Sequence, residues 1–381
     1  MKKIFYFGLI GLALFEIANV YFIMPMPGSQ RINSIDVAYF LYSYRWWFRF
    51  IFIIMMMVGS VDAFSVRRKW IPLLAILPVG FIVYNFNFKM TADHMFLQPA
   101  NLVFKSQSGN TLTDSSIVVT VNHNNEAKAY PIRFIQYHHQ VRDTVGGKPV
   151  MVTYCNVCRT GRVFEPTVNG KPEDFRLVGM DHFNAMFEDK STGSWWRQAN
   201  GEAIKGPLQG TMLPELESNQ MSLRLFFMMH PSGKVMQRDD LFRESYDSTG
   251  RYEKGRSKGQ LTRTDSLSWK DKSWVVGIDL NGEAKAYDWF DLKRKRVIND
   301  MIGNIPVVVV ISSDDQSFAA FRRKPDEMFT TRNDSLIAFA NRYDLMGRSS
   351  DGDKLEPVKA YQEFWHSWRT FHPATTTYKS E

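Results

Sequence analysis

The chain has 381 residues, enough for two or three domains, and 44% of them are hydrophobic, which excludes a disordered or fibrous protein. The formal net charge is +8, but the first 89 residues hold nine basic and three acidic side chains, so the remainder carries only +2. Because that remainder lacks a concentrated basic face, we expect no nucleic-acid partner. Two cysteines are too few for a disulfide scaffold.

Three apolar runs open the chain, at residues 4–24, 38–58 and 70–88, and each is long enough to cross a bilayer. The first run has no small-residue cleavage site, so we interpret it as a span and not as a signal peptide. Basic residues precede the first run and the third, and such clusters stay in the cytoplasm. We therefore expect residues 1–89 to form a lipid-embedded anchor with three transmembrane helices, and residues 90–381 to lie on the extracytoplasmic side.

Two charged side chains interrupt these apolar runs, Glu16 in the first and Arg49 in the second. An isolated charge in hydrocarbon is costly, so we expect an intramembrane ion pair between them. A proton path is the alternative, although no further ionisable residues extend the pair into a chain.

An internal repeat organises the rest of the chain. Residues 117–154 align without a gap on residues 274–311, at a constant offset of 157, with thirteen identities in 38 positions. The two copies also end alike, with FFMMHP at residues 226–231 and WRTFHP at residues 368–373. We expect a first repeat at 90–246, a linker or long exposed loop at 247–272, and a second repeat at 273–381.

Short apolar runs bounded by turn residues predict β-structure in each repeat. Residues 117–121 and 127–130 flank Asn124 and Asn125, which favour a hairpin turn. Residues 150–154 are typical of a buried strand, and residues 131–138 of one short helix. The expected fold class is an α-helical anchor followed by a β-rich α+β domain, built of two pseudo-symmetric repeats.

A Cys-x-x-Cys pair, Cys155 and Cys158, follows the buried strand of the first repeat only. The offset of 157 places Ser312 and Asp315 at these positions in the second repeat. The second repeat therefore keeps the surrounding scaffold residues and lacks both thiols.

Imidazole and thioether side chains are lost together with the thiols. His138 and His139 have basic, non-imidazole counterparts in the second repeat, and a looser alignment leaves Met180 and His182 without counterparts of their own type. The joint loss indicates that these side chains act as one unit in the first repeat.

Three interpretations of the cysteine pair stay open. A structural disulfide across so short a loop adds little stability. A redox dithiol is the second interpretation, with Arg159 or His138 beside the thiols to favour the thiolate. A metal site is the third, in which Cys155, Cys158, His139, His182 and Met180 supply ligands. Thioether favours copper, and zinc fits less well because structural zinc needs four ligands.

The motifs PVMVTYCNVCRTGRVF, EDKSTGSWWRQANGEAIKGPLQGTML and FWHSWRTFHPATTTY resemble a bacterial family of unknown function, the domain-of-unknown-function family numbered 3179. The resemblance covers most of residues 115–378 and implies anchoring in the bacterial inner membrane. The family pattern has proline after the first cysteine and glycine after the second, whereas this chain has Asn156 and Arg159. The resemblance supplies a location for the site and no reaction.

Two functions follow from these interpretations. The leading hypothesis is an extracytoplasmic, membrane-anchored protein that uses its thiols for copper binding or for dithiol redox chemistry. The alternative is a non-catalytic envelope subunit that binds a membrane or envelope partner, or a ligand between its repeats, with the cysteines in a structural disulfide.

Overall fold

The computed structural model describes residues 1–65 and 67–379, so the last two residues of the expected second repeat lie outside the described residues. The chain forms two compact units. The first unit, which we call the anchor unit, combines residues 1–97 with residues 174–197 and 202–211. The second, which we call the β-rich unit, holds residues 98–173, 198–201 and the chain from residue 212 onward.

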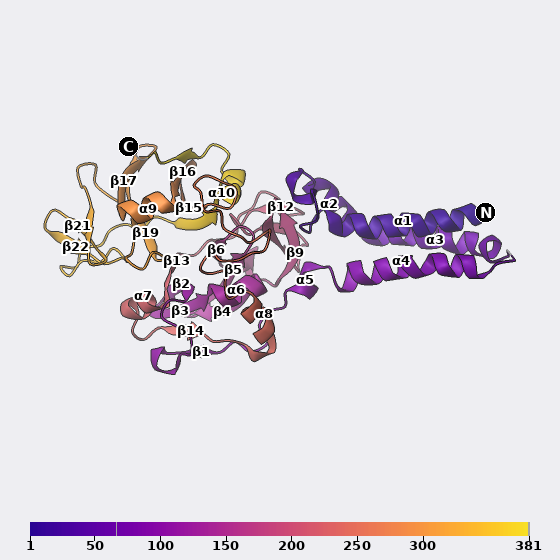
Figure 1. The fold of residues 1–381 in the computed structure, drawn as a ribbon, viewed down its shortest axis with the longest axis horizontal. Helices are drawn as coiled ribbons and strands as arrows, with labels where there is room; N and C mark the ends of the chain where they lie inside the picture. Colours follow the sequence, from indigo (N-terminus) through magenta and orange to yellow (C-terminus); the bar gives the residue numbers. More distant parts are fainter. Residues whose placement is uncertain (66, 380–381) are drawn as a thin grey trace. The chain divides into compact units, whose positions relative to one another are not determined.

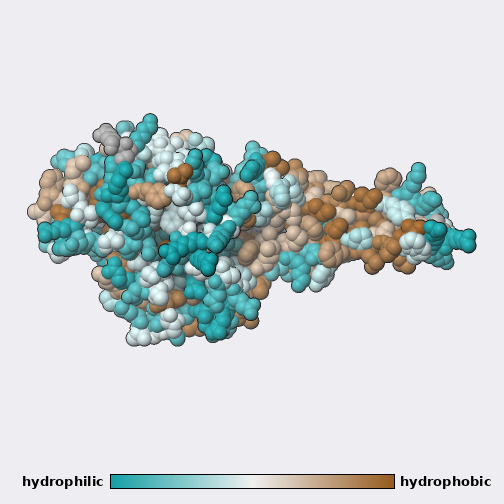
Figure 2. Space-filling model, in the orientation of Figure 1, coloured by the Kyte–Doolittle hydropathy of each residue, from teal (hydrophilic) through white to brown (hydrophobic). Residues whose placement is uncertain are grey.

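Three long apolar helices dominate the anchor unit: α1 (Lys2–Tyr21), α3 (Arg45–Phe64) and α4 (Trp70–Phe88). Each is long and apolar enough to cross a membrane. They lie side by side (Figure 1), with α1 packed against both α3 and α4. Hydrophobic residues gather over their outer surface (Figure 2), as a helix bundle in contact with lipid requires.

The second long helix begins at Arg45, seven residues after the start of the apolar run that suggested it. The chain instead forms a short helix, α2 (Ile35–Ser43), and leaves helical geometry at Tyr44. The reason is aromatic packing, because the rings of Tyr39 and Tyr42 lie 5.0 and 5.3 Å from that of Trp195. Tyr39 and Tyr42 are half-buried, and both rings pack against protein.

A three-residue polar network joins the long helices. Arg49 on α3 donates to both carboxylate oxygens of Glu16 on α1, at 2.7 and 2.9 Å. Asn87 on α4 completes the network, because it accepts from Arg49 at 2.6 Å and donates to Glu16 at 2.9 Å. Glu16 is 1% exposed. The network thus satisfies a charge that burial would otherwise penalise heavily.

A four-stranded sheet, in the order β12-β11-β10-β9, completes the anchor unit. Its strands are β9 (Phe175–Asp181), β10 (Asn184–Asp189), β11 (Trp195–Arg197) and β12 (Ala203–Lys205). The amide of Met180 donates to the carbonyl of Ile23 at 2.7 Å. Gly179 allows this approach, because a Cβ there would lie 2.2 Å from the same carbonyl oxygen. A backbone hydrogen bond therefore joins the sheet to the segment that follows α1.

In the β-rich unit, the elements of the two sequence copies follow in the same order. The first copy contains β2 (Ile117–His123), β3 (Glu126–Pro131), α6 (Ile132–His138), β4 (Gln140–Val145), β5 (Lys148–Cys155), β6 (Thr160–Phe164), β13 (Ser218–Ser222), α7 (Leu223–Met229) and β14 (Lys234–Met236). The second contains β15 (Trp274–Leu280), β16 (Glu283–Asp288), α9 (Trp289–Lys295), β17 (Val297–Ile302), β18 (Ile305–Ile311), β19 (Phe318–Arg322), β23 (Ala360–Phe364), α10 (Trp365–Phe371) and β24 (Thr376–Thr377).

These strands form several small sheets. In the first copy the orders are β1-β14-β3-β2-β13 and β4-β5-β6; in the second they are β23-β15-β16-β24 and β17-β18-β19. Smaller elements are β1 (Phe104–Lys105), β7 (Thr167–Val168), β8 (Lys171–Pro172), the meander β20 (Thr330–Arg332), β21 (Ser335–Ala338) and β22 (Asn341–Tyr343), and the helices α5 (Ala92–Met95) and α8 (Arg243–Ser248). The expected β-rich α+β class is therefore observed at this coarse level.

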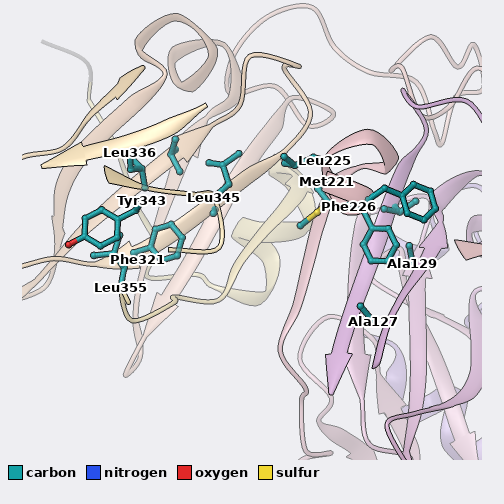
Figure 3. Packing of buried hydrophobic residues seen from close by; sticks show 14 of the residues in the cluster. Ala127, Ala129, Met221, Leu225, Phe226, Phe321, Leu336, Tyr343, Leu345 and Leu355 are labelled. Carbon is teal, nitrogen blue, oxygen red and sulfur yellow. The ribbon is translucent and has the colours of Figure 1, made fainter. Parts of the chain in front are cut away.

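The two copies share a hydrophobic core. Ala127, Ala129 and Phe226 of the first copy belong to the same buried cluster as Phe321 and Tyr343 of the second. Figure 3 shows Met221 and Leu225 between these two groups. Each copy also has a core of its own, one around Tyr130 and one around Tyr287. Burial of this apolar surface holds the copies together.

The identical residues of the repeat have a common structural use. Lys128 forms an ion pair with Asp143 at 2.9 Å, and Lys285 forms the same pair with Asp300 at 2.6 Å. Tyr130 donates to Asp143 at 2.7 Å, and its side chain is fully buried. The run Glu126–Tyr130 recurs in the second copy because it packs the first hairpin onto the neighbouring strand.

Candidate functional site

The two cysteines lie at the end of β5 and in the turn that leads to β6. Cys155 closes β5, and residues 156–159 form the turn. Both side chains are thiols and both are 0% exposed. Asn156 is the one residue between Met151 and Thr160 that is not buried. Any ligand that approaches the thiols from solvent therefore meets Asn156 first.

Arg159 closes this turn in an unusual conformation. Its φ is +58°, in the left-handed region that favours glycine. This geometry explains why the family pattern has glycine here. The arginine side chain is 0% exposed and gains contacts that glycine cannot make.

Those contacts connect the turn to the segment between the copies and to the second copy. Arg159 donates to the backbone carbonyls of Tyr252 and Glu253 at 3.1 and 2.8 Å, and to the side chain of Gln362 at 3.1 Å. Its guanidinium also lies 3.7 Å from the ring centroid of Trp274. The buried side chain of Arg159 thus fixes the position of the turn.

Lys272 and His366 face the turn from the other side. The ammonium of Lys272 donates to the carbonyl of Val157, the residue before Cys158, at 2.8 Å. Nε2 of His366 lies 3.1 Å from the same ammonium and 3.2 Å from the same carbonyl. His366 lies on α10. The amide of Phe364, at the end of the preceding strand, donates to the carbonyl of Cys158 at 2.8 Å and so holds His366 near the turn. The site therefore contains a cation and an imidazole that come from distant parts of the chain.

The electrostatics of this group favour a neutral histidine beside a charged lysine. Burial lowers the pKa of His366 to about 3, and the Lys272 ammonium acts in the same direction. Burial also lowers the pKa of Lys272, whereas Cys158 and Cys155 raise it. The lysine and the two sulfur atoms are therefore close enough to interact through their charges, and a buried cation stabilises a neighbouring thiolate.

His139 lies beside the strand that carries Cys155. Its Nδ1 contacts the carbonyl of Tyr154 at 2.9 Å, and its own carbonyl accepts from the Tyr154 amide at 2.9 Å. The side chain is 1% exposed, and burial lowers its pKa to about 4. A neutral imidazole is thus held against the residue that precedes the first thiol.

The second copy shows what replaces this arrangement. Arg296 occupies the position of His139, and its carbonyl accepts from the Ile311 amide at 3.0 Å, as that of His139 does from Tyr154. The Arg296 guanidinium forms an ion pair with Asp315 at 2.6 Å. Asp315 aligns with Cys158, so an ion pair stands in the second copy where the first has imidazole and thiol.

The remaining candidates from the sequence have contacts with other residues. Nε2 of His138 contacts the hydroxyl of Tyr246 at 2.5 Å within an aromatic cluster. Met180 and His182 belong to the anchor unit, whereas the cysteines belong to the β-rich unit. Nδ1 of His182 contacts Asp181 at 2.6 Å, and its Nε2 contacts Asn33 at 2.9 Å. Each of these two histidines therefore has local partners of its own.

Among residues 1–65 and 67–379, no three side chains of the His, Cys, Asp and Glu types are grouped so as to hold a metal ion. The contacts near the thiols described above come from an ammonium, Lys272, and from the imidazoles of His366 and His139.

Sequence reasoning missed Lys272 and His366. Lys272 lies in the polar segment that was interpreted as a linker, and His366 lies six residues before the His-Pro pair that drew attention. One feature of the sequence could have indicated His366: the WHSW stretch at residues 365–368, whose first-copy counterpart lacks a histidine. An imidazole found in one copy only was the same type of clue as the cysteines.

The family motif around Asp189 has a structural role. The Asp189 carboxylate accepts from the amides of Thr192 and Ser194 at 2.6 and 3.1 Å, and from the Trp196 indole at 2.9 Å. The Leu208 amide in the Gly-Pro-Leu stretch donates to the Ser194 hydroxyl at 3.1 Å. The two motifs therefore fold one compact loop of the anchor unit and do not build a second site.

Comparison with known proteins gives one match. No curated protein and no solved structure matches the chain. Residues 98–375, which include both cysteines, Lys272 and His366, match the family described as "Protein of unknown function (DUF3179)". The chain belongs to this family, as its Cys-x-x-Cys and His-Pro motifs suggested.

Proposed function

We propose that this protein is a membrane-anchored dithiol protein, in which Cys155 and Cys158 exchange with the disulfide of a substrate. The observation that carries the proposal is the Lys272 ammonium, held 2.8 Å from the carbonyl between the two cysteines. A cation in this position favours thiolate, and thiolate is the reactive form in disulfide exchange. The neutral imidazole of His366 lies 3.1 Å from the same ammonium.

The exchange proceeds in two steps. One thiolate attacks a sulfur of the substrate R–S–S–R, the S–S bond breaks, and R–S⁻ leaves with a proton taken from the site. The second thiol then attacks the mixed disulfide, which releases the second R–SH and leaves a bond between Cys155 and Cys158. The pair loses two electrons and two protons, and the substrate gains them. A separate dithiol must reduce the pair again in each cycle.

This function accounts for the difference between the two copies. An ion pair between Arg296 and Asp315 fills the corresponding place in the second copy, so the scaffold does not need the thiols. A purely structural pair would be expected to matter equally in both copies. Copper or zinc binding is less well supported, because the described residues hold no group of three His, Cys, Asp or Glu side chains placed to bind a metal ion.

A redox titration of the full chain in detergent tests the proposal. We expect Cys155 and Cys158 to convert reversibly between dithiol and disulfide, with a single midpoint, as measured by mass shift after thiol alkylation at defined dithiol-to-disulfide ratios. Replacement of both cysteines by serine should remove the transition and leave the fold intact. A double variant that cannot fold would instead support a structural disulfide.

A second candidate function, a ligand-binding envelope subunit, is favoured by one observation. A polar cavity of about 140 Å³ is lined by residues of both copies. Thr120, Asn122 and Asn219 come from the first copy, and Arg348 and Lys354 from the second. Cells that carry only the double serine variant and behave as wild type would favour this candidate over the dithiol function.

The two copies are, in our proposal, related by pseudo-twofold symmetry. Gln220 on β13 and Gln362 on β23 occupy matching places, two residues before the end of their strands. The side-chain nitrogen of Gln220 donates to the side-chain oxygen of Gln362 at 2.8 Å. Contact between equivalent residues is the arrangement that a twofold axis produces. The first copy thus supplies the thiols, and the second supplies His366.

The proposed location is the bacterial inner membrane, with the thiols on the extracytoplasmic side. Support comes from the three apolar helices and from Lys2, Lys3 and the Arg67–Lys69 cluster, which indicate cytoplasmic ends. Such a location also suits a lipid-embedded anchor and an envelope partner. A phosphatase reporter fused to the C-terminus should be active, whereas an active cytoplasmic reporter at the same position would refute this topology.

A further inference from the structure

The segment between the two copies forms one wall of a pocket beside the cysteine turn. The cavity has a volume of about 410 Å³ and is lined by ten residues. They come from α6, the cysteine turn and the segment 248–262: Gln136, Asn156, Ser248, Thr249, Arg251, Tyr252, Ser257, Lys258, Gly259 and Thr262. Its volume lies in the range of sites that hold small organic molecules.

The pocket is connected to the thiols through Asn156. This side chain is the only part of the buried stretch 151–160 that reaches the surface, and it lines the pocket. The hydroxyl of Tyr252, another lining residue, donates to the carbonyl of Asn156 at 2.7 Å. A ligand in the pocket therefore contacts the turn that holds both cysteines and the residue that braces it.

The charges of the lining select anions. Arg251 and Lys258 line the pocket, and no Asp or Glu does. Within the described part of the chain, neither of these two side chains forms an ion pair with a carboxylate. The acidic residue next to the pocket wall, Glu253, is buried and accepts from the Arg133 amide at 3.0 Å. Burial raises the pKa of Glu253 to about 7, so this carboxyl is about half protonated at neutral pH and offsets only part of the positive charge.

The other lining groups are mostly polar. They include four hydroxyl side chains, Ser248, Thr249, Ser257 and Thr262, and the amides of Gln136 and Asn156. The hydroxyls of Ser248 and Thr249 and the amide of Gln136 donate to backbone carbonyls, whereas Ser257 and Thr262 share one hydrogen bond at 2.6 Å and keep one hydroxyl proton for a ligand. A carboxylate oxygen accepts from that hydroxyl and from the side-chain amide of Asn156. The pocket thus combines positive charge with a small number of neutral donors.

We infer that this pocket is the substrate site of the proposed dithiol function, and that it takes a small disulfide bearing carboxylates. The inference rests on the proposed function for its redox step. The anionic disulfide binds against Arg251 and Lys258 beside Asn156, and exchange with the thiols proceeds as described above. Two thiols of the substrate leave, and the pair retains the disulfide.

The test compares two disulfides of opposite charge type on the reduced full chain in a neutral detergent. Dithiobis-nitrobenzoate carries two carboxylates, and dithiodipyridine is neutral. We expect the anionic reagent to react about tenfold faster, relative to its rate with a simple thiol, than the neutral one. Replacement of Arg251 and Lys258 by alanine should abolish this preference.

A matched control removes two exposed cations elsewhere in the β-rich unit, by Lys171→Ala and Arg332→Ala, and should keep the preference. Equal rates for both reagents, unaffected by the pocket variants, would overturn the inference and leave the dithiol function standing. Failure of both reagents to react would overturn the dithiol function.

A binding measurement separates these outcomes further. Calorimetry of oxidised glutathione, a disulfide with several carboxylates, on the double serine variant does not depend on exchange. Saturable binding that Arg251→Ala weakens by about tenfold supports the pocket, whereas absent binding contradicts it.

Discussion

Replacement of Arg159 by alanine is expected to lower the free energy of unfolding of the β-rich unit by about 3 kcal/mol or more, because each buried acceptor left without a donor costs about 1–3 kcal/mol. Alanine leaves the carbonyls of Tyr252 and Glu253 and the side chain of Gln362 without their donor. It also keeps the left-handed backbone at residue 159, which costs a non-glycine residue about 1 kcal/mol. Thermal or chemical unfolding of the full chain measures the effect.

Two variants make this result interpretable. Arg159→Gly restores the family residue and removes the backbone strain, so it should be about 1 kcal/mol less harmful than alanine. Arg332→Ala, an exposed arginine in the same unit, should change stability by less than about 0.5 kcal/mol. A loss of stability at position 159 no larger than that at position 332 would show that the buried Arg159 side chain does not stabilise the turn.

Replacement of Glu16 by leucine should destabilise the three-helix bundle by about 3–5 kcal/mol, because it leaves the Arg49 guanidinium without its carboxylate. Arg49 donates to both Glu16 oxygens, and Asn87 alone cannot neutralise its charge. Retention of helix content and resistance to proteolysis, followed during heating in mild detergent, report the loss.

The double variant Glu16→Leu with Arg49→Leu decides between packing and charge. Removal of both charges should recover most of the stability, since the pair is replaced by apolar side chains of similar size. A double variant as unstable as the single one would mean that the side-chain shapes, and not the ion pair, hold α1 against α3.

Local patterns predicted the elements well because they depend on neighbouring residues. The three apolar runs gave three long helices, and the Asn124-Asn125 turn lies between β2 and β3 as expected. The start of α3 was displaced because Tyr39 and Tyr42 pack against Trp195, more than 150 residues away. The pattern of the first 89 residues alone therefore could not predict that contact.

The site shows the same division. The cysteines were found from their spacing, and His139 from its loss in the second copy. Lys272 and His366 could not be found from spacing, because the fold brings them to Val157 across 115 and 209 residues. In the sequence, only the glycine of the family pattern indicated the left-handed backbone of Arg159. No local pattern indicated its buried contacts.

The central claim is that Lys272 activates the cysteine pair, and the ultraviolet absorbance of thiolate, followed against pH in the reduced full chain, tests it most directly. We predict that thiolate forms in the wild-type protein at a pH about one unit or more below that in the Lys272→Met variant, because the variant keeps the size of the side chain and loses its charge. The double serine variant should give no signal. Thiolate formation at the same pH in wild type and in Lys272→Met would contradict the account.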